Sequence, residues 1–341
     1  MKKTLLIGAG AIGGTLAVLM KDAGYDVSLL LRNSEAKAKI EKDGFSLHGV
    51  KGDRNVRFTC YSSVEELKDE KFDVVIIATK YQVLNSVAES ILGNLKDDSL
   101  VVGMQNGILT ESLASVVGKD RAVGVMIGFG ATRNEPGDVT MTSLGEMYIG
   151  MLDGRHPGNL DYLKEMLSVV LPTKISDDIF RRQYSKLIIN SCINATAAVT
   201  GLTLGKMVDD KRARTLYLAI AREAMRVAKK MGIDVPKYGK MMNYKMLMLA
   251  DNAVYNSCCR YVVWLVSKLK YSSVKPSTLQ SLEKGETTEI DIFNGYIAKL
   301  GEENGVETPV NSKLTAMIHE IEKGERKITP DNLEEFRGML F

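Results

Sequence analysis

The sequence is poor in the residues that build metal centres and disulfide frameworks. Its 341 residues include 4 cysteines, 3 histidines and 1 tryptophan. No cysteine pair has C-x-x-C spacing, the adjacent pair is a poor disulfide candidate, and the histidines are scattered. We therefore expect no bound metal and no secreted disulfide scaffold. These residues are Cys60, Cys192, Cys258, Cys259, His48, His156 and His319.

Long apolar runs and a dominant charge are also absent. The stretch YVVWLV (261–266) is far below the ~18 residues that span a bilayer. Two lysines lead into TLLIGAG, a run too short and glycine-rich for an export signal. The 45 Lys and Arg residues nearly balance 42 Asp and Glu residues. We therefore expect a cytoplasmic protein without a membrane or nucleic acid partner, although a local basic site for an anionic ligand is compatible with this balance.

What is present in the first half is an alternation of short apolar runs and helical segments. The helical segments include AIGGTLAVLMKDAG and LTESLASVVG. The alternation is typical of a doubly wound, Rossmann-type α/β domain with a parallel sheet. The apolar runs are TLLIG (4–8), DVSLLL (26–31), DVVIIA (73–78) and SLVVGM (99–104).

The remainder of the chain divides into strands and then helices. Residues 121–150, with a turn at EPGD, are expected to extend the sheet in antiparallel fashion. A helix over 160–171 and a short strand (174–178) complete a domain that spans 1–179. An all-helical domain, 180–341, follows. Its expected helices are 181–199, 206–231, 237–269, 288–303 and 311–323.

The segment GAGAIG (8–13) has the G-x-G-x-x-G pattern between a strand and a helix. In this context Gly8 permits a tight turn, Gly10 lets the backbone approach a pyrophosphate, and Gly13 lets the helix pack on the sheet. The helix N-terminus favours the anion. The pattern predicts a dinucleotide site, and the alternative is a glycine-rich turn without such a function.

The next strand indicates which nucleotide is bound. An NAD site usually has an acidic residue at the end of this strand, but here Arg32 follows LLL, and Asp26 lies at the wrong end. A guanidinium suits a 2′-phosphate, so we expect NADP(H). The alternative is a solvated surface arginine.

Two further strand ends carry polar residues. Thr79, Lys80 and Gln82 follow one strand, and Gln105 and Asn106 follow the next. Ligands of open α/β sheets bind beyond the carboxyl ends of strands, so both groups are expected on the cofactor side. Solvated loop polarity is the alternative, above all for Lys80.

The segment KLIINSCIN (186–194) combines an apolar helix with a polar stripe. Lys186, Asn190 and Asn194 share one face at i, i+4 and i+8 spacing. A buried lysine can protonate a carbonyl oxygen, and two amides can hold a hydroxyl or carboxylate. Because the segment follows the domain junction, it is expected to line a substrate cleft. A partly solvated polar face is the alternative.

A second polar cluster lies in residues 275–291. Ser277 is placed to cap the helix that follows Pro276, and Glu289 to act as an acid at a helix N-terminus. Both structural roles are compatible with a role in a site.

Together these motifs resemble the ketopantoate reductase (2-dehydropantoate 2-reductase) family. They occur in the family's order along nearly the whole chain, and their joint order is more specific than any one of them. The motifs are GAGAIG (8–13), Arg32, Lys80, MQNG (104–107), GAT and EPGDV (130–139), KLIINSCIN (186–194), and PST with TTEIDIFNG (276–295).

The resemblance implies hydride transfer from NADPH to the C2 ketone of 2-dehydropantoate, giving (R)-pantoate, a step toward pantothenate and coenzyme A. It implies Lys186 as the proton donor. The implied cofactor-binding residues are Gly8, Ala9, Gly10, Ala11, Ile12, Gly13, Arg32, Lys80, Asn106, Ala131 and Glu289. The implied substrate-binding residues are Lys186, Asn190, Asn194 and Ser277.

Three departures from the family pattern bear on the substrate. Gln82 follows Lys80 more closely than is usual, and Tyr184 stands where a tryptophan is common. The methionine-rich segment 237–275 is unexpectedly long, which favours a core or homodimer-interface helix over a reshaped substrate pocket. Two other functions stay open: another NADP-dependent 2-oxo or 3-hydroxy acid dehydrogenase, and a non-catalytic NADP sensor.

Overall fold

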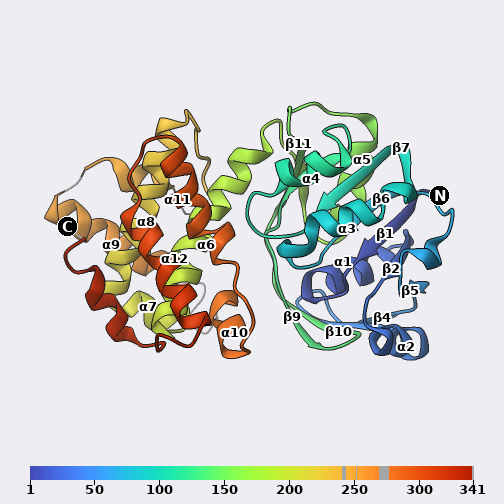
Figure 1. The fold of residues 1–341 in the computed structure, drawn as a ribbon, viewed down its shortest axis with the longest axis horizontal. Helices are drawn as coiled ribbons and strands as arrows, with labels where there is room; N and C mark the ends of the chain where they lie inside the picture. The colour runs from blue at the N-terminus through green and yellow to red at the C-terminus, as the bar shows by residue number, and fades with distance from the viewer. Residues whose placement is uncertain (240–242, 251, 269–275, 340–341) are drawn as a thin grey trace. The chain divides into compact units, whose positions relative to one another are not determined.

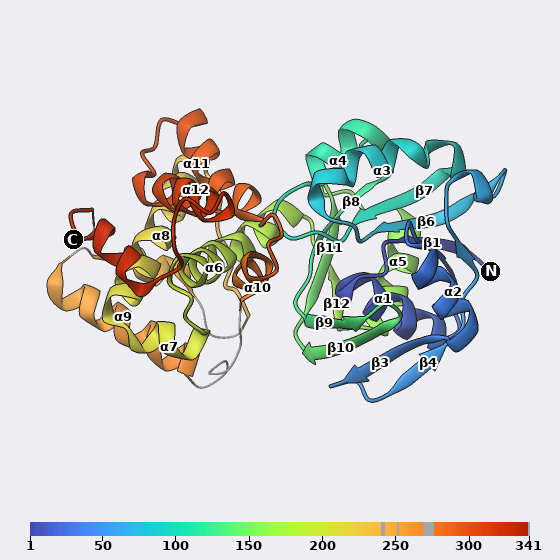
Figure 2. The ribbon, with the colours of Figure 1, turned by 60° about the horizontal axis from the view of Figure 1, so that its bottom comes forward.

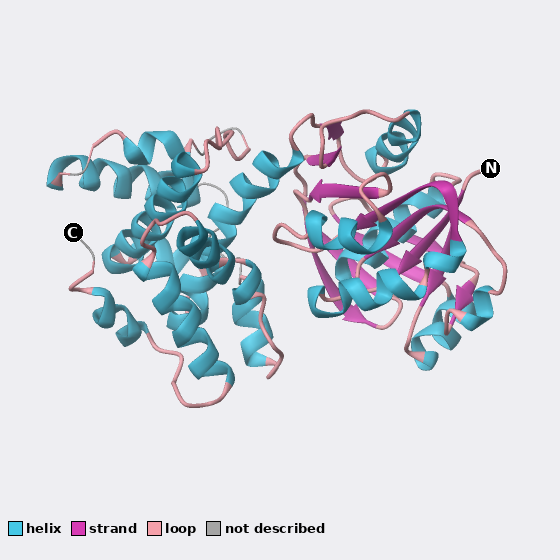
Figure 3. Cartoon of the chain, turned by 45° about the horizontal axis from the view of Figure 1, so that its top comes forward, coloured by secondary structure: helices cyan, strands magenta, loops and turns pink. Residues whose placement is uncertain are grey.

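The computed structural model describes residues 1–239, 243–250, 252–268 and 276–339. It divides into two compact units, Met1–Gln183 and Tyr184–Phe341. Within the described residues, all strands belong to the first unit and the second unit is helical (Figure 1 and Figure 3). This confirms the predicted fold class. Across the same residues, no helix has both the length and the hydropathy needed to cross a membrane.

The main sheet of the first unit has eight strands in the order β12-β11-β8-β7-β6-β1-β2-β5. Its neighbouring strands are parallel, except that β11 runs antiparallel to β8. The four apolar runs predicted as parallel strands are confirmed as β1, β2, β6 and β7. The strands are β1 (Lys3–Ile7), β2 (Asp26–Leu30), β5 (Cys60–Tyr61), β6 (Phe72–Ile77), β7 (Leu95–Gly103), β8 (Ala122–Met126), β11 (Met147–Met151) and β12 (Thr173–Ile175).

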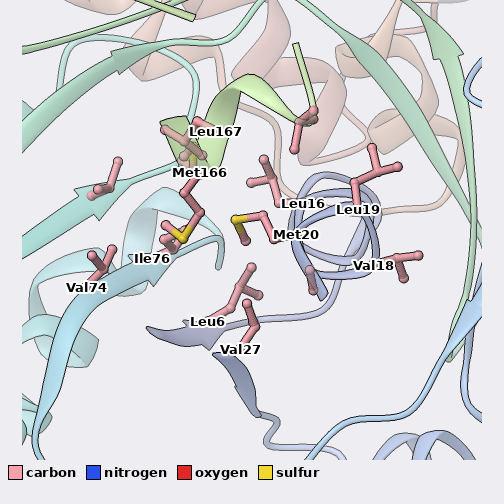
Figure 4. Close-up of a cluster of buried hydrophobic side chains, with 14 of the residues drawn as sticks. Leu6, Leu16, Val18, Leu19, Met20, Val27, Val74, Ile76, Met166 and Leu167 are labelled. Atoms are coloured by element: carbon pink, nitrogen blue, oxygen red, sulfur yellow. The ribbon is translucent and has the colours of Figure 1, made fainter. Parts of the chain in front are cut away.

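Both faces of this sheet are covered by helices. Leu6 of β1 packs into a core with α1 and α5, whereas its neighbours Leu5 and Ile7 pack into a second core with α3 and α4. Figure 4 shows Leu6 with Leu16 of α1 and Met166 of α5. Burial on both faces explains the uninterrupted apolar runs. The helices are α1 (Ala11–Asp22), α3 (Leu84–Ser90), α4 (Thr110–Val117) and α5 (Gly158–Ser168).

A second sheet, which the sequence did not predict, lies against the outer side of α1 (Figure 2). The expectation that 121–150 extends the main sheet is therefore wrong for β9 and β10, and only β11 adds an antiparallel strand there. The cause lies in α1, which is buried from Gly13 to Met20 and therefore must pack against other elements on more than one face. A Cβ on Gly14 would lie 2.3 Å from the Phe45 ring. The order is β4-β3-β10-β9, with β3 (Phe45–Gly49), β4 (Arg54–Val56), β9 (Gly130–Glu135) and β10 (Asp138–Ser143).

The helical unit is entered through α6 (Ile179–Thr200), which begins in the first unit and continues into the second. The expectation of a single helix over 206–231 is wrong, because the helix is interrupted at Asp210. The carboxylate of Asp210 accepts a hydrogen bond from Arg212 N at 2.7 Å and caps the start of a new helix. Likewise, the helix expected over 288–303 begins as a short 3-10 turn. The elements are α7 (Leu204–Asp209), α8 (Lys211–Lys230), α10 (Ser277–Glu283), η5 (Ile290–Ile292), α11 (Asn294–Glu303) and α12 (Pro309–Glu322).

The segment 237–269 is not the one long helix expected from the sequence. A short 3-10 helix, η4 (Tyr244–Met248), precedes α9 (Ala253–Lys268), and residues 240–242, 251 and 269 lie outside the described ones. The side chain of Asn243 accepts from Lys245 N, and that of Asn252 from Tyr255 N. Such local side-chain bonds compete with a continuous helix.

Candidate active site

The glycine turn between β1 and α1 has the geometry of a dinucleotide-binding loop. Gly8 has φ +93°, and a Cβ there would lie 3.1 Å from the carbonyl of Ala78, just after β6. A Cβ on Gly13 would lie 2.0 Å from Gly8 O. Only glycine fits at these two positions. The turn lies where the strand order reverses between β1 and β6, which is where open α/β sheets bind ligands.

Gly10, the second glycine of the motif, borders open space. A Cβ on Gly10 would meet no atom within 4 Å, and Gly10 is the N-cap of α1 without a side-chain cap. The first turn of α1 contains no acidic residue. Its backbone N–H groups and the helix dipole therefore suit a pyrophosphate, with Ala9, Ala11 and Ile12 in the same turn.

Arg32 lies two residues after the end of β2 and is exposed. Gly8 N donates to Leu30 O at 3.1 Å, which ties the glycine turn to this strand end. In the part of the chain that the structure describes, Arg32 forms no ion pair. Asn33 has a structural role, because its side chain accepts a hydrogen bond from Ala36 N and caps α2 (Ser34–Asp43). The guanidinium is thus available to a nucleotide phosphate.

The ends of β6 and β7 carry the other polar groups expected beside the cofactor. Lys80 is exposed and Asn106 is partly buried. Buried Gln105 donates to Ile77 O and Thr79 O, both at 3.0 Å, and so fixes the two strand ends together. Its Oε1 and Thr79 Oγ1 are buried without a hydrogen-bond partner. Buried oxygens without a partner are uncommon in proteins, so these two are candidates for contact with a bound ligand.

Ala131 lies on β9 of the second sheet, opposite Met141 of β10. It is partly buried against the core that contains α1. The cofactor contact that the family resemblance implies for Ala131 stays a prediction.

The polar stripe of α6 lies on an otherwise buried helix. Lys186 and Asn190 are partly exposed and Asn194 is buried, whereas Leu187 and Ile188 between them are fully buried. Burial lowers the pKa of Lys186 to about 8, and the carboxylate of Glu289 acts in the opposite direction. A lysine with this pKa can hold or release its proton near neutral pH.

Asn194 meets Ser277 from a segment far along the chain. Ser277 Oγ donates to Asn194 Oδ1 at 3.2 Å, and Thr278 N approaches the same oxygen at 3.5 Å. The expectation that Ser277 caps its helix is wrong, because Pro276 is the N-cap of α10 and Ser277 follows it. Its hydroxyl instead joins the α6 stripe, which brings two predicted substrate-binding residues together.

Glu289 is the N-cap residue of η5, the position expected of an acid at a helix N-terminus, although its side chain makes no cap hydrogen bond there. A group of residues that sequence reasoning missed holds its segment. Thr288 N donates to Glu322 at 2.8 Å, and His319 contacts Glu322 and Asp291, each at 2.9 Å. Burial lowers the pKa of His319, but the bonds to both carboxylates outweigh it and raise the pKa overall. His319 and Glu322 are a local i, i+3 pair on α12, whereas Thr288 and Asp291 meet them only through packing against this helix.

Tyr184, the departure from the family pattern beside Lys186, is fully buried, and its hydroxyl donates to Ala224 O of α8 at 2.8 Å. This position therefore anchors α6 to α8.

Comparison with known proteins gives matches along most of the chain. Residues 4–154 match the family described as Ketopantoate reductase PanE/ApbA, and residues 178–322 match its C-terminal model. The chain belongs to the ketopantoate reductase family. The resemblance inferred from the motifs is therefore confirmed, and with it the oxidoreductase class.

Curated relatives in the ketopantoate reductase family have low sequence identity to this chain but align over nearly their whole length. The 2-dehydropantoate 2-reductase of Archaeoglobus fulgidus is 26% identical over 325 residues, covering 95% of this chain and 99% of the relative. That of Aquifex aeolicus is 24% identical over 323 residues, covering 93% and 96%.

Solved structures of the same fold include two differently named proteins. A PanE/ApbA family ketopantoate reductase from Ralstonia eutropha has a TM-score of 0.78 at 24% identity, with 95% of this chain and 100% of that chain covered. A D-mandelate dehydrogenase with NADH and anilino(oxo)acetate has a TM-score of 0.79 at 23% identity, with 94% and 98% covered. At this identity the structures establish the fold alone.

Proposed function

We propose that this protein is an NADPH-dependent reductase that converts 2-dehydropantoate to (R)-pantoate, a step toward pantothenate. The observation that carries the proposal is on α6 and its partners: Lys186, with a pKa lowered to about 8, shares a helix face with the Asn194–Ser277 pair. The names of the full-length relatives support this substrate.

The N-terminal unit would bind the nucleotide. The open space at Gly10 and the N–H groups of α1 suit the pyrophosphate, and Arg32 suits a 2′-phosphate. Lys80, Asn106, Ala131 and Glu289 remain further proposed cofactor contacts. When bound, NADPH supplies the hydride to the ketone carbon.

Lys186 would act on the ketone oxygen. Hydride arrival at the carbon leaves negative charge on that oxygen, which the lysine ammonium stabilises and then protonates. Asn190, Asn194 and Ser277 would orient the substrate through its hydroxyl and carboxylate groups. This orientation sets the face of the ketone that is reduced and hence the product configuration.

A second candidate is reduction of a different 2-oxo acid. The likeness to a D-mandelate dehydrogenase bound to NADH favours this alternative, since that protein has a different named substrate and cofactor. A non-catalytic NADP sensor is the third candidate, but a sensor has no use for a lysine poised as a proton donor.

A substrate panel separates these functions. The purified protein is mixed with NADPH and 2-dehydropantoate, 2-oxoisovalerate, pyruvate or phenylglyoxylate, and NADPH consumption is followed. We expect the highest kcat/KM with 2-dehydropantoate. Preference for another acid would establish the second candidate, and NADPH binding without turnover of any acid would establish a sensor.

A further inference from the structure

The helical unit has a hollow of about 450 Å³ that includes none of the proposed active-site residues. It is formed by the end of α7, the start of α8 and one side of α9. Hollows of this size are typical of small-molecule sites. The lining residues are Asp209, Lys211, Arg214, Ser257, Arg260, Tyr261 and Trp264.

Three cations line this hollow without carboxylate partners. Within the described residues, Lys211, Arg214 and Arg260 form no ion pair. Arg214 donates to Val208 O, yet its Nε is buried without a partner. By contrast, the neighbouring Arg212 pairs with two carboxylates and is not part of the lining.

The position of two of these cations is itself unfavourable. Lys211 and Arg214 lie in the first turn of α8, where the helix dipole disfavours positive charge. The carboxylate of the N-cap residue Asp210 is bound by Arg212. The like charges also repel one another. A bound anion would relieve both effects, so the arrangement points to a ligand and not to fold stability.

The single carboxylate in the lining is directed to an aromatic residue. Asp209 Oδ1 accepts a hydrogen bond from Trp264 Nε1 at 3.1 Å, which helps to hold the indole in place. The Trp264 ring stacks with that of Tyr261, with centroids 5.6 Å apart. Tyr261 is 60% exposed, so a flat ring surface lies beside the cations.

We propose that this hollow binds an organic phosphate that carries a planar ring, of the nucleoside phosphate class. Guanidinium groups hold phosphate oxygens through paired hydrogen bonds, and Arg214 and Arg260 supply two such groups from different helices. The exposed Tyr261 ring is available to stack with the base. The proposal is independent of the reaction assigned to the active site.

The test measures ATP binding by titration calorimetry with the protein already saturated with NADPH, so that the dinucleotide site is filled. We expect one additional ATP site per chain. The double variant Arg214→Gln/Arg260→Gln should weaken it about tenfold or more. Arg212→Gln, a matched arginine in the same turn, should leave it within about twofold. No binding in the presence of NADPH, or equal binding by the double variant, overturns the proposal.

Tyr261→Ala tests the ring contact separately and affects an exposed side chain. It should weaken ATP binding while leaving the binding of inorganic pyrophosphate unchanged. If ATP and pyrophosphate bind the parent protein equally, the site does not recognise the ring. Arg32→Ala provides the last control: loss of the additional ATP site in that variant would place the ATP in the dinucleotide site and contradict the proposal.

Discussion

At the residue scale, the chemistry depends most on the ammonium group of Lys186. Its proposed role requires the protonated form, which is present below its pKa of about 8 and lost as the pH rises through that value. We therefore predict that kcat/KM for the keto acid falls above about pH 8. Lys186→Met should lower turnover by about 10²–10⁴-fold and leave the NADPH dissociation constant within about threefold.

Steady-state rates from pH 6 to pH 10, together with NADPH binding to both proteins, check this prediction. Lys230→Met, a change at an exposed lysine of α8, serves as the control and should be as active as the parent protein. A flat pH profile, or a fully active Lys186 variant, would remove the lysine from the mechanism.

Arg32 determines the cofactor in the proposed account. Because its guanidinium is exposed and has no ion-pair partner among the described residues, Arg32→Ala should weaken NADPH about tenfold or more. NADH lacks the 2′-phosphate, so its affinity should change by less than about twofold. Fluorescence titrations with both nucleotides measure the difference. Equal losses would show that the arginine is structural and that NADP specificity has another origin.

At the element scale, substitutions in the turn between β1 and α1 can distinguish effects on protein stability from effects on NADPH binding. A Cβ on Gly13 would lie 2.0 Å from Gly8 O, so Gly13→Ala should destabilise the protein by about 1–3 kcal/mol and weaken NADPH. A Cβ on Gly10 would meet no protein atom, so Gly10→Ala should change stability by less than about 1 kcal/mol yet still weaken NADPH. Urea unfolding and NADPH titration test both variants, and unchanged NADPH affinity in Gly10→Ala would place the pyrophosphate elsewhere.

The contacts of His319 on α12 predict how the free energy of unfolding depends on pH. The pKa of His319 is raised above its ordinary value of 6.5, so its contribution to stability is present below that value and is lost as the pH rises through the raised pKa. His319→Gln should therefore lower the free energy of unfolding more at pH 5.5 than at pH 9.

Urea unfolding at both pH values measures this difference. Among the described residues, His156 forms an ion pair with Asp161 alone, at the surface. It provides the matched control, and His156→Gln should show a smaller effect. An equal loss of stability at both pH values would contradict ion pairs between protonated His319 and the carboxylates of Asp291 and Glu322.

How much the sequence predicts also differs between elements. Strands buried on both faces, such as β6, are continuous apolar runs and were predicted. Strands β9 and β10 were expected within residues 121–150 but were assigned to the main sheet. Strands β3 and β4 were not predicted, and β4 has only three residues, none of them fully buried. The largely apolar helix α1 was the available signal that another layer must cover it.

In the candidate site, local sequence patterns could be predicted, but contacts between distant segments could not. The glycine turn and the α6 stripe are local patterns, so they could be predicted from spacing. Ser277 contacts Asn194, 83 residues away, and only the family resemblance assigned both residues to the substrate site. The contact of His319 with Asp291 could not be predicted, because the two residues meet only when α12 packs beside η5.

At the scale of the whole molecule, the family models and relatives cover both units, so the proposed reaction can draw on nucleotide-binding and proton-donating groups in one chain. Identity of about 25% with those relatives supports the oxidoreductase class more strongly than it supports one substrate. The substrate is therefore the central claim to test.

The most direct measurement is kcat/KM for 2-dehydropantoate with NADPH, compared with phenylglyoxylate under the same conditions, with the product identified by chiral chromatography. We predict a clear preference for 2-dehydropantoate and a product that is (R)-pantoate. A higher kcat/KM for phenylglyoxylate, or no NADPH consumption with 2-dehydropantoate, would contradict the proposed function.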